Sequence, residues 1–115
     1  MKKVKFFHWK KCSTCRNAKA VLVDMGVELE ERDFFQLPLS KEELLDILVG
    51  RSAGDIFSWN SPSFKKLGLA RENLSDGDLI EMMLNEPRFI RRPLITVGNQ
   101  LVVGLNKDGL TKLLA

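Results

Sequence analysis

The chain has 115 residues, the size of one ordinary domain, and its 44% hydrophobic and 29% charged residues exclude an intrinsically disordered protein. Its 18 basic and 15 acidic residues give a net charge of +3, which permits contact with anions but does not require it. The 2 cysteines and 1 histidine are too few for a disulfide-built scaffold or a four-ligand zinc site within one chain. Residues 1–8 contain no apolar segment of signal-peptide length, and no apolar run reaches the roughly 18 residues of a membrane helix, so we expect a cytoplasmic protein.

The first third of the chain predicts a strand, a helix and a second strand. Residues 4–7 form a short apolar run that is typical of a buried strand. Ser13 or Thr14 is suited to cap the helix that follows, and Gly26 is suited to end it. The apolar face of this helix has i, i+3, i+4, i+7 spacing and consists of Ala18, Val21, Leu22 and Met25. Residues 27–33 indicate the second strand, and a βαβ unit of this size pairs its strands in parallel.

The middle of the chain predicts helices that begin at serine caps. Ser40 opens the capping box Ser40-Lys41-Glu42-Glu43, and the helix after it is expected to end near Gly50. Ser61-Pro62 has the form of an N-cap followed by a proline at the first helical position. Ser75 caps a further helix, which must end before Pro87 because the residue before a proline disfavours the α conformation.

The last third predicts a hairpin and a final helix. Residues 94–97 and 100–103 are rich in β-branched side chains and flank Gly98-Asn99, which indicates a tight turn of type II′ or I′. Asn106 is suited to cap a last helix, whose apolar residues Leu110, Leu113 and Leu114 share one face.

The order of these elements predicts the fold class. A parallel pair of strands and an antiparallel hairpin make an α/β protein with a four-stranded mixed sheet, built from a β-α-β half and a β-β-α half. This is the plan of the thioredoxin-like fold. We expect a single domain over residues 1–115, with its halves at about 1–36 and 88–115 and a helical insertion at about 37–87.

Cys12-Ser13-Thr14-Cys15 is the motif that carries chemistry, since it lies where a strand ends and a helix begins. The thiolate is the reactive form of cysteine, and a helix N-terminus favours it. We therefore predict that Cys12 is the nucleophile and that Cys15 resolves the mixed disulfide formed on it. Positive charge from Lys10, Lys11 and Arg16 would support the thiolate. Two alternatives remain: a structural pair of buried thiols, or half of a zinc site shared between chains.

Three further residues are candidates for the site. His8 either supports the Cys12 thiolate as an imidazolium or is a histidine satisfied by backbone hydrogen bonds. Trp9 is interpreted as a lid or packing residue rather than a ligand contact. Arg92 precedes Pro93, and the thioredoxin-like plan places a cis-proline against the cysteines, so Arg92 either holds an oxyanion or acidic substrate near the thiols or is solvated.

The chain resembles the arsenate reductase (ArsC)/Spx family of thioredoxin-like proteins over essentially its whole length. The resemblance rests on these segments together: His8, Cys12-Ser13-Thr14-Cys15-Arg16-Asn17-Ala18, Leu67-Gly68-Leu69, Glu86-Pro87, Arg91-Arg92-Pro93-Leu94-Ile95 and Val103-Gly104. In ArsC-type enzymes, a cysteine matching Cys12 attacks arsenate, glutathione and glutaredoxin supply electrons, and an arginine matching Arg92 helps bind the oxyanion. Spx-type members use CxxC as a redox switch and bind the α subunit of RNA polymerase.

The sequence also departs from the ArsC pattern. Two further arginines of the ArsC site have no counterpart, since residues 57–60 contain none and Gly104 falls near the second position. ArsC-type sites usually lack a cysteine at the place of Cys15, and the CxxC motif and residues 103–106 are more similar to Spx. One guanidinium would bind an arsenate dianion weakly, because each charged hydrogen bond contributes about 1.5–3 kcal/mol.

The main hypothesis is an ArsC-family thiol–disulfide oxidoreductase in which Cys12 attacks a disulfide or an arsenate-like oxyanion and Cys15 resolves the intermediate. The predicted substrate-binding residues are Arg92, Pro93 and His8, with no metal and no bound cofactor. An external thiol reductant, either glutathione with glutaredoxin or thioredoxin, is the expected redox partner. The alternative is an Spx-like, redox-sensing transcriptional regulator that binds the RNA polymerase α subunit. We expect a monomer that binds neither DNA directly nor membranes.

Overall fold

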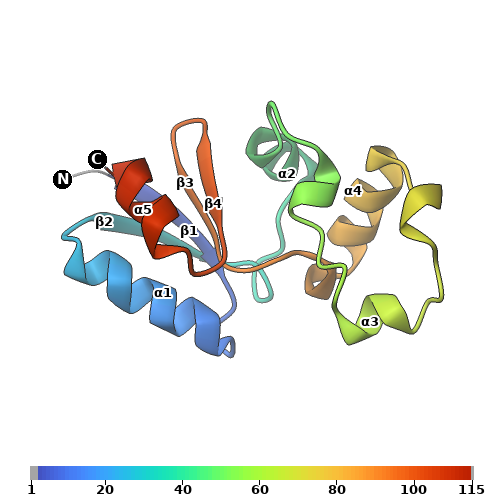
Figure 1. Ribbon diagram of the computed structural model, residues 1–115, viewed down its shortest axis with the longest axis horizontal. Coiled ribbons are helices and arrows are strands. Elements are labelled where there is room, and N and C mark those ends of the chain that lie inside the picture. Colours follow the sequence, from blue (N-terminus) through green and yellow to red (C-terminus); the bar gives the residue numbers. More distant parts are fainter. Residues whose placement is uncertain (1–2, 115) are drawn as a thin grey trace. The chain divides into compact units, whose positions relative to one another are not determined.

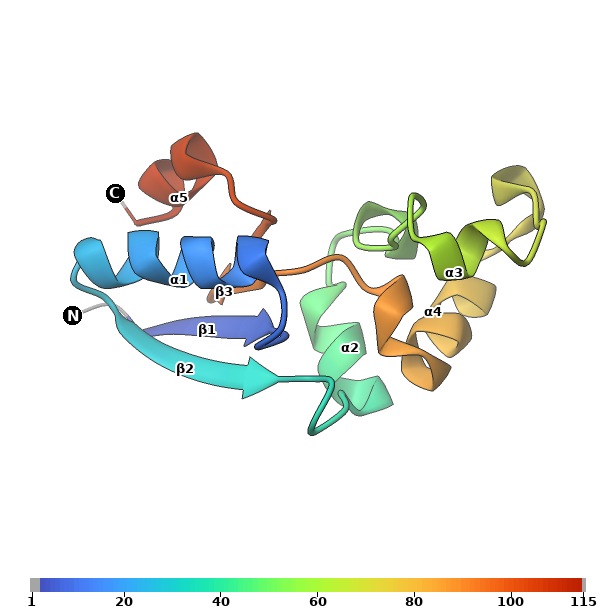
Figure 2. The ribbon, with the colours of Figure 1, turned by 90° about the horizontal axis from the view of Figure 1, so that it is seen from below.

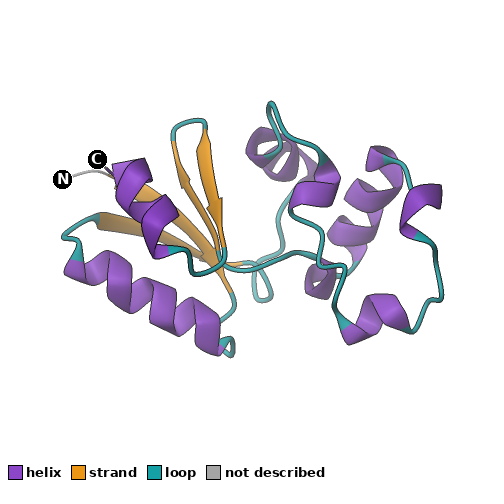
Figure 3. Cartoon of the chain, viewed as in Figure 1, coloured by secondary structure: helices purple, strands orange, loops and turns teal. Residues whose placement is uncertain are grey.

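The structure, a computed structural model, describes residues 3–114. Its contacts divide the chain into two compact units. The sheet unit comprises the N-terminal residues up to Leu37 and the C-terminal residues from Arg92 onward, and the helical unit comprises Pro38–Arg91. Figure 3 shows that the strands gather in the sheet unit, whereas helices and loops make up the helical unit. That the two units fold as one domain stays a prediction.

The sheet unit contains four strands and two helices (Figure 1). They are β1 (Lys3–His8), α1 (Ser13–Asp24), β2 (Glu28–Asp33), β3 (Leu94–Val97), β4 (Gln100–Val103) and α5 (Lys107–Leu114). The strand order is β2-β1-β3-β4, with β1 parallel to β2 and antiparallel to β3, and β3 antiparallel to β4. This arrangement confirms the predicted thioredoxin-like fold with its mixed four-stranded sheet.

One face of the sheet is packed by both helices of its unit. The shared core contains residues of β1, α1, β3, β4 and α5: Val4, Phe6, Cys15, Ala18, Leu22, Ile95, Val102, Leu110 and Leu113. Figure 2 shows α1 running beside β1 and β2 on this face. Because side chains alternate along a strand, His8 projects to the same face as Phe6, and its ring stacks on the Phe6 ring. The end of β1 therefore directs His8 toward the side of the sheet that α1 covers.

The turn between β3 and β4 resolves the alternative that the sequence left open. Gly98 has a φ of 57°, and no residue other than glycine has a positive φ in the described part of the chain. A positive φ at only the first central residue is the pattern of a type II′ turn, which matches the twist of the two strands. The expected strand boundaries at 94–97 and 100–103 are confirmed.

The helical unit contains three α-helices and three 3-10 helices. They are α2 (Lys41–Ile47), η1 (Ala53–Asp55), α3 (Pro62–Lys65), η2 (Arg71–Asn73), α4 (Asp76–Asn85) and η3 (Pro87–Phe89). Ser40 and Ser75 form the reciprocal capping boxes of α2 and α4, and Ser61 caps α3 with Pro62 in its first turn. The core of the helical unit contains Leu44, Ile47, Ile56, Phe57, Leu79, Met83 and Phe89. The predicted helix starts are confirmed, and the short 3-10 helices were not predicted.

Candidate active site

Cys12 is the N-cap of α1, which corrects the expectation that Ser13 or Thr14 caps this helix. Its backbone is extended, with φ −90° and ψ 117°, and its sulfur accepts a hydrogen bond from the backbone N–H of Cys15 at 3.3 Å. The Cys12 N–H donates to the Trp9 carbonyl at 2.9 Å, which closes the turn that leads into the helix. A thiol therefore takes the position where an oxygen side chain usually binds the first free amides of a helix, and those amides favour a negatively charged sulfur.

Cys15 lies one turn into α1 and faces the core of the sheet unit. It is only 1% exposed and packs with Phe6, Ala18 and Leu22. Burial, and after it a side-chain hydrogen bond with Cys12, raises the pKa of the Cys15 thiol to about 12, while the Trp9 backbone and the charge of Arg92 act in the opposite direction. Cys15 is therefore protonated at neutral pH.

The two cysteines are both free and differ in their surroundings. Cys12 is partly exposed, so a substrate can reach its sulfur, whereas Cys15 is buried behind it. Their side chains are hydrogen-bonded to each other. This arrangement suits thiol–disulfide exchange, because the accessible sulfur can be attacked or can attack, and the protonated partner lies within bonding reach.

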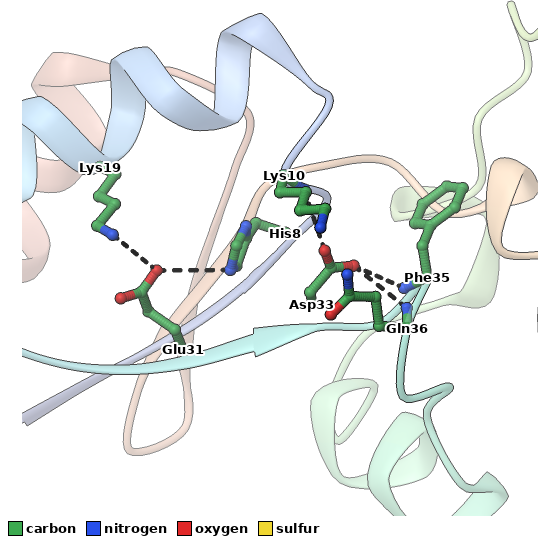
Figure 4. A network of polar contacts seen from close by, with 7 residues as sticks. All are labelled: His8, Lys10, Lys19, Glu31, Asp33, Phe35 and Gln36. Carbon is green, nitrogen blue, oxygen red and sulfur yellow. Dashed lines mark hydrogen bonds and ion pairs between the residues drawn. The ribbon is translucent and has the colours of Figure 1, made fainter.

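Asp33, at the end of β2, organises the loops next to the cysteines (Figure 4). One of its carboxylate oxygens accepts the backbone N–H of Lys10 at 3.2 Å. The other accepts the backbone N–H groups of Phe35 at 3.0 Å and Gln36 at 3.4 Å. The loop that leads from β1 to Cys12 and the loop that leaves β2 are thus bonded to the same carboxylate.

His8 has an acidic neighbour on β2. Its Nε2 lies 3.5 Å from Oε1 of Glu31, and the same oxygen lies 3.1 Å from Nζ of Lys19 on α1 (Figure 4). The His8 side chain is 14% exposed. This is a third arrangement beside the two alternatives considered from the sequence, because a carboxylate partners the ring. A contribution of His8 to the Cys12 thiolate stays a prediction.

Arg92 and Pro93 lie immediately before β3 and are joined by a cis peptide bond, as the thioredoxin-like plan implies. The Arg92 guanidinium carbon lies 5.4 Å from the ring centroid of Trp9 and 5.2 Å from that of Phe35. Its positive charge acts on Cys15, where it lowers the thiol pKa against the larger effect of burial. The structure thus brings Arg92 to the cysteine pair, and its binding of a substrate anion stays a prediction.

The other basic residues near the motif differ in their roles. The Arg16 guanidinium donates to the Lys10 carbonyl at 2.9 Å and so braces the loop before Cys12. Lys10 and Lys11 are exposed at this loop. The charges of these two lysines are available to an approaching substrate, whereas the Arg16 guanidinium also supports the loop.

The sequence did not indicate two features of this region, the Asp33 carboxylate and the aromatic residue Phe35. The sequence predicts Asp33 only as the last residue of a strand, and no pattern in it distinguishes Phe35. An aspartate that ends a strand can form an Asx turn with the backbone that follows, and this is the only local signal that points to Asp33. The stack of Trp9 on Phe35 depends on which strands pair, which local sequence does not specify.

Among residues 3–114, no three histidine, cysteine or acidic side chains lie together in a way that would hold a metal ion. Within the same part of the chain, no helix combines the length and apolar character needed to cross a membrane.

Comparisons with known proteins give a consistent family. The profile of the ArsC family matches residues 7–113. The global transcriptional regulator Spx of Streptococcus pyogenes serotype M1 is 38% identical over 99 residues, which cover 84% of this chain and 74% of that protein. An arsenate reductase from Vibrio cholerae has a similar structure, with a TM-score of 0.85, 24% identity and coverage of 97% of this chain and 98% of that chain. A possible arsenate reductase from Streptococcus mutans UA159 has a TM-score of 0.76 and 26% identity, and covers 94% of this chain and 97% of that chain.

Proposed function

We propose that this chain, which belongs to the ArsC family, is a thiol–disulfide oxidoreductase in which Cys12 attacks an oxidised substrate and Cys15 completes the reduction. The observation that carries the proposal is the contrast between the two sulfurs. Cys12 is accessible at the start of α1, and Cys15 is buried, protonated and hydrogen-bonded to it. The Cys12 sulfur is thus available to the substrate, and the Cys15 sulfur reacts only after an intermediate has formed on Cys12.

With a disulfide substrate, the reaction balances without a cofactor. The Cys12 thiolate attacks one substrate sulfur, a mixed disulfide forms, and the other substrate sulfur leaves as a thiolate. This leaving thiolate takes the proton of Cys15, whose sulfur then attacks the Cys12 sulfur and releases the second half of the substrate, which takes a proton from water. Two electrons pass from the chain to the substrate, and a Cys12–Cys15 disulfide remains. An external thiol, supplied by glutathione with glutaredoxin or by thioredoxin, returns the two electrons.

The same pair of cysteines can reduce a small oxyanion such as arsenate. Two thiols and two further protons convert the arsenate dianion to arsenous acid and one water, with the same Cys12–Cys15 disulfide as the oxidised product. Arg92 and Pro93 would hold the anion next to Cys12, with His8 as the third predicted substrate-binding residue. The relationship to a possible arsenate reductase of Streptococcus mutans supports this substrate class.

A coupled assay tests the proposal. Purified protein is supplied with NADPH and with glutathione and glutaredoxin, or with thioredoxin and its reductase, and either a small disulfide or arsenate is added. We expect substrate-dependent NADPH consumption, its loss in Cys12→Ser, and accumulation of a mixed disulfide in Cys15→Ser. Full turnover in Cys12→Ser would refute the assignment of the nucleophile. No turnover with any pair of reductant and substrate would refute the enzymatic function.

A second candidate function is an Spx-like redox regulator that binds the RNA polymerase α subunit. The relative from Streptococcus pyogenes, a global transcriptional regulator, supports this alternative. Here the Cys12–Cys15 disulfide would change the affinity for polymerase rather than appear in a catalytic cycle. Capture of the α subunit that depends on the redox state of the two cysteines, without turnover in the coupled assay, would favour it.

The surroundings in which either function would operate are part of the proposal. A cysteine pair that must be reduced again fits the cytoplasm, where thiols are kept reduced. We expect a monomer whose partners are a thiol-reducing protein and a small substrate, or the polymerase subunit in the regulatory alternative. Direct contact with DNA is not expected.

A further inference from the structure

Trp9 and Phe35 form an aromatic stack next to the cysteine motif. Their ring centroids are 4.3 Å apart and their planes differ by 15°. Trp9 belongs to the loop between β1 and α1, and Phe35 belongs to the loop that follows β2. Both side chains are partly exposed, so the stack lies at the surface of the sheet unit rather than in its core.

Asp33 fixes the two loops that carry these rings. Its carboxylate accepts the backbone N–H of Lys10, the neighbour of Trp9, and the backbone N–H of Phe35 itself. The backbone positions from which both rings project are therefore bound to one side chain. Since an ionised carboxylate makes strong hydrogen bonds to backbone amides, the stack is assembled before any substrate arrives.

Arg92 lies against both rings of this stack. Its guanidinium carbon is 5.4 Å from the Trp9 centroid and 5.2 Å from the Phe35 centroid, within the distance of about 6 Å at which a cation is attracted to an aromatic face. Contact with two aromatic rings restricts the Arg92 side chain more than contact with one ring would, because the guanidinium must stay close to both. Trp9 also accepts the hydrogen bond of the Cys12 N–H through its carbonyl. One residue thus contacts Arg92 through its ring and Cys12 through its backbone.

We propose that Trp9 and Phe35, fixed by Asp33, are positioning residues that hold the Arg92 guanidinium beside the cysteine pair and so set the reactivity of Cys12 and the reduction potential of the pair. The inference deepens the proposed thiol–disulfide function, on which its biological meaning rests. The charge of Arg92 acts on Cys15, which is consistent with a guanidinium held near the buried member of the pair.

The sign of the effect follows from charge. Reduction adds two electrons and one proton to the Cys12–Cys15 disulfide and yields one thiolate and one thiol. A fixed cation stabilises the thiolate and hence the reduced form, which makes the reduction potential less negative. When the cation moves away, alkylation of Cys12 becomes slower and the disulfide becomes harder to reduce.

The test is a double-mutant cycle in the full chain. Trp9→Leu, Phe35→Leu and Arg92→Ala are made singly, and each aromatic variant is combined with Arg92→Ala. We measure the rate of Cys12 alkylation by iodoacetamide between pH 6 and 8, and the equilibrium of the cysteine pair with a glutathione buffer. Each single aromatic variant is expected to slow alkylation by about threefold to tenfold, the range that cation–π energies imply. In the Arg92→Ala background the same aromatic changes should have no further effect, because their influence passes through Arg92.

Controls separate positioning from a general loss of packing. Phe64→Leu removes a buried aromatic ring from the helical unit, and Arg71→Ala removes a guanidinium that lies 4.4 Å from the Trp59 ring centroid. Neither control should alter Cys12 alkylation. Trp9→Phe keeps an aromatic face and should restore most of the rate that Trp9→Leu loses, and Trp9→Gln replaces Trp9→Leu if the leucine variant does not fold.

The outcomes distinguish this inference from the proposed function. Effects of Trp9→Leu and Arg92→Ala that simply add, or an alkylation rate unchanged in both aromatic variants, would overturn the positioning role. Failure of Trp9→Phe to restore the rate would overturn it as well. Alkylation and the glutathione equilibrium need no substrate, so a positive cycle in a protein without turnover would refute the enzymatic function and leave the positioning role supported.

Discussion

The helical unit and the sheet unit of this chain are organised by contacts of different range. In the helical unit, each of the three α-helices begins at a serine whose side chain bonds an amide only three residues away. In the sheet unit, the site joins the loop after β1, the loop after β2 and the segment before β3, so that Trp9 meets Phe35 and both meet Arg92. The helices of the helical unit therefore depend on residues that are neighbours in the chain. The site of the sheet unit forms only when the whole sheet has assembled.

This difference has a consequence for mutations. A change at a local cap should affect stability alone, because the cap serves only its own helix. A change among the residues that converge beside Cys12 should affect thiol chemistry. Four predictions test or sharpen this contrast.

The largest effect is expected within the sheet unit itself, between its two cysteines. At pH 7 the raised pKa of Cys15 leaves about one thiol in 100,000 ionised, and the side chain is only 1% exposed. Iodoacetamide should therefore label Cys12 at least about a thousandfold faster than Cys15 in the native protein. Mass spectrometry of digested, partly labelled protein measures the ratio. Comparable labelling of both in the folded state would contradict the assigned roles, and comparable labelling in urea is the expected control.

The second prediction concerns stability at alkaline pH. The pKa of Cys15 is raised in the folded state from 9.0 to about 12, so the folded protein holds this proton more tightly than the unfolded chain. The resulting stability is fully present below pH 9 and is lost as the pH rises toward 12. The loss approaches about 4 kcal/mol in the free energy of unfolding, because each pKa unit corresponds to about 1.4 kcal/mol.

The measurement compares the wild type with Cys15→Ala. Lysines also titrate in this range, so the quantity of interest is the difference between the two pH profiles of urea unfolding. The variant is expected to be less stable at pH 7 but to lose less stability between pH 9 and 11. Parallel profiles would show that the Cys15 proton is not linked to folding.

The third prediction tests whether caps in the helical unit act only locally. Ser75→Ala removes the side chain that accepts the Asp78 N–H at 3.1 Å, and the same change at Ser40 removes a bond of 3.1 Å to the Glu43 N–H. Each should lower the free energy of unfolding by about 1 kcal/mol. The rate of Cys12 alkylation should stay unchanged, and Ser75→Asp, which keeps an N-cap oxygen, should restore most of the stability. An altered alkylation rate in either alanine variant would break the contrast between the two units.

The same contrast explains how much of the structure could be predicted from the sequence. The caps at Ser40, Ser61 and Ser75 and the turn at Gly98 were predicted because each depends on a few adjacent residues. Cys12 replaced the expected Ser13 or Thr14 as the cap of α1. Cysteine is not a usual N-cap residue, so capping propensities favour the hydroxyl side chains of Ser13 and Thr14. In the structure, the turn closed by the Trp9 carbonyl places the Cys12 sulfur at the cap instead.

The candidate site was predictable in its parts but not in its arrangement. CxxC and the Arg92-Pro93 pair stand out in the sequence. The bonds of Asp33 to Lys10 and the pairing of Glu31 with Lys19 and His8 join residues on separate elements. They depend on the register of β1 against β2, which places Phe6 opposite Glu31 and His8 opposite Asp33. Strand register is set by the whole sheet, so local patterns in this chain do not reveal these contacts.

The smallest effects are expected from ion pairs, and they offer a matched test across the two units. Lys41 and Glu81 form an exposed pair at 3.3 Å in the helical unit, and Lys19 and Glu31 form a more covered pair at 3.1 Å in the sheet unit. Lys41→Met should change the free energy of unfolding by less than about 0.5 kcal/mol, because solvent and salt screen an exposed pair.

Lys19→Met should cost somewhat more, about 0.5–1 kcal/mol, because its pair with Glu31 is more covered and therefore less screened. Urea unfolding at pH 7, at low and high salt, measures both variants, and the cost of Lys19→Met should persist more at high salt. Equal effects with the same salt dependence would mean that the Glu31 cluster behaves as an ordinary surface pair, and that the cooperation between separate elements in the sheet unit is confined to the residues around Asp33 and Arg92.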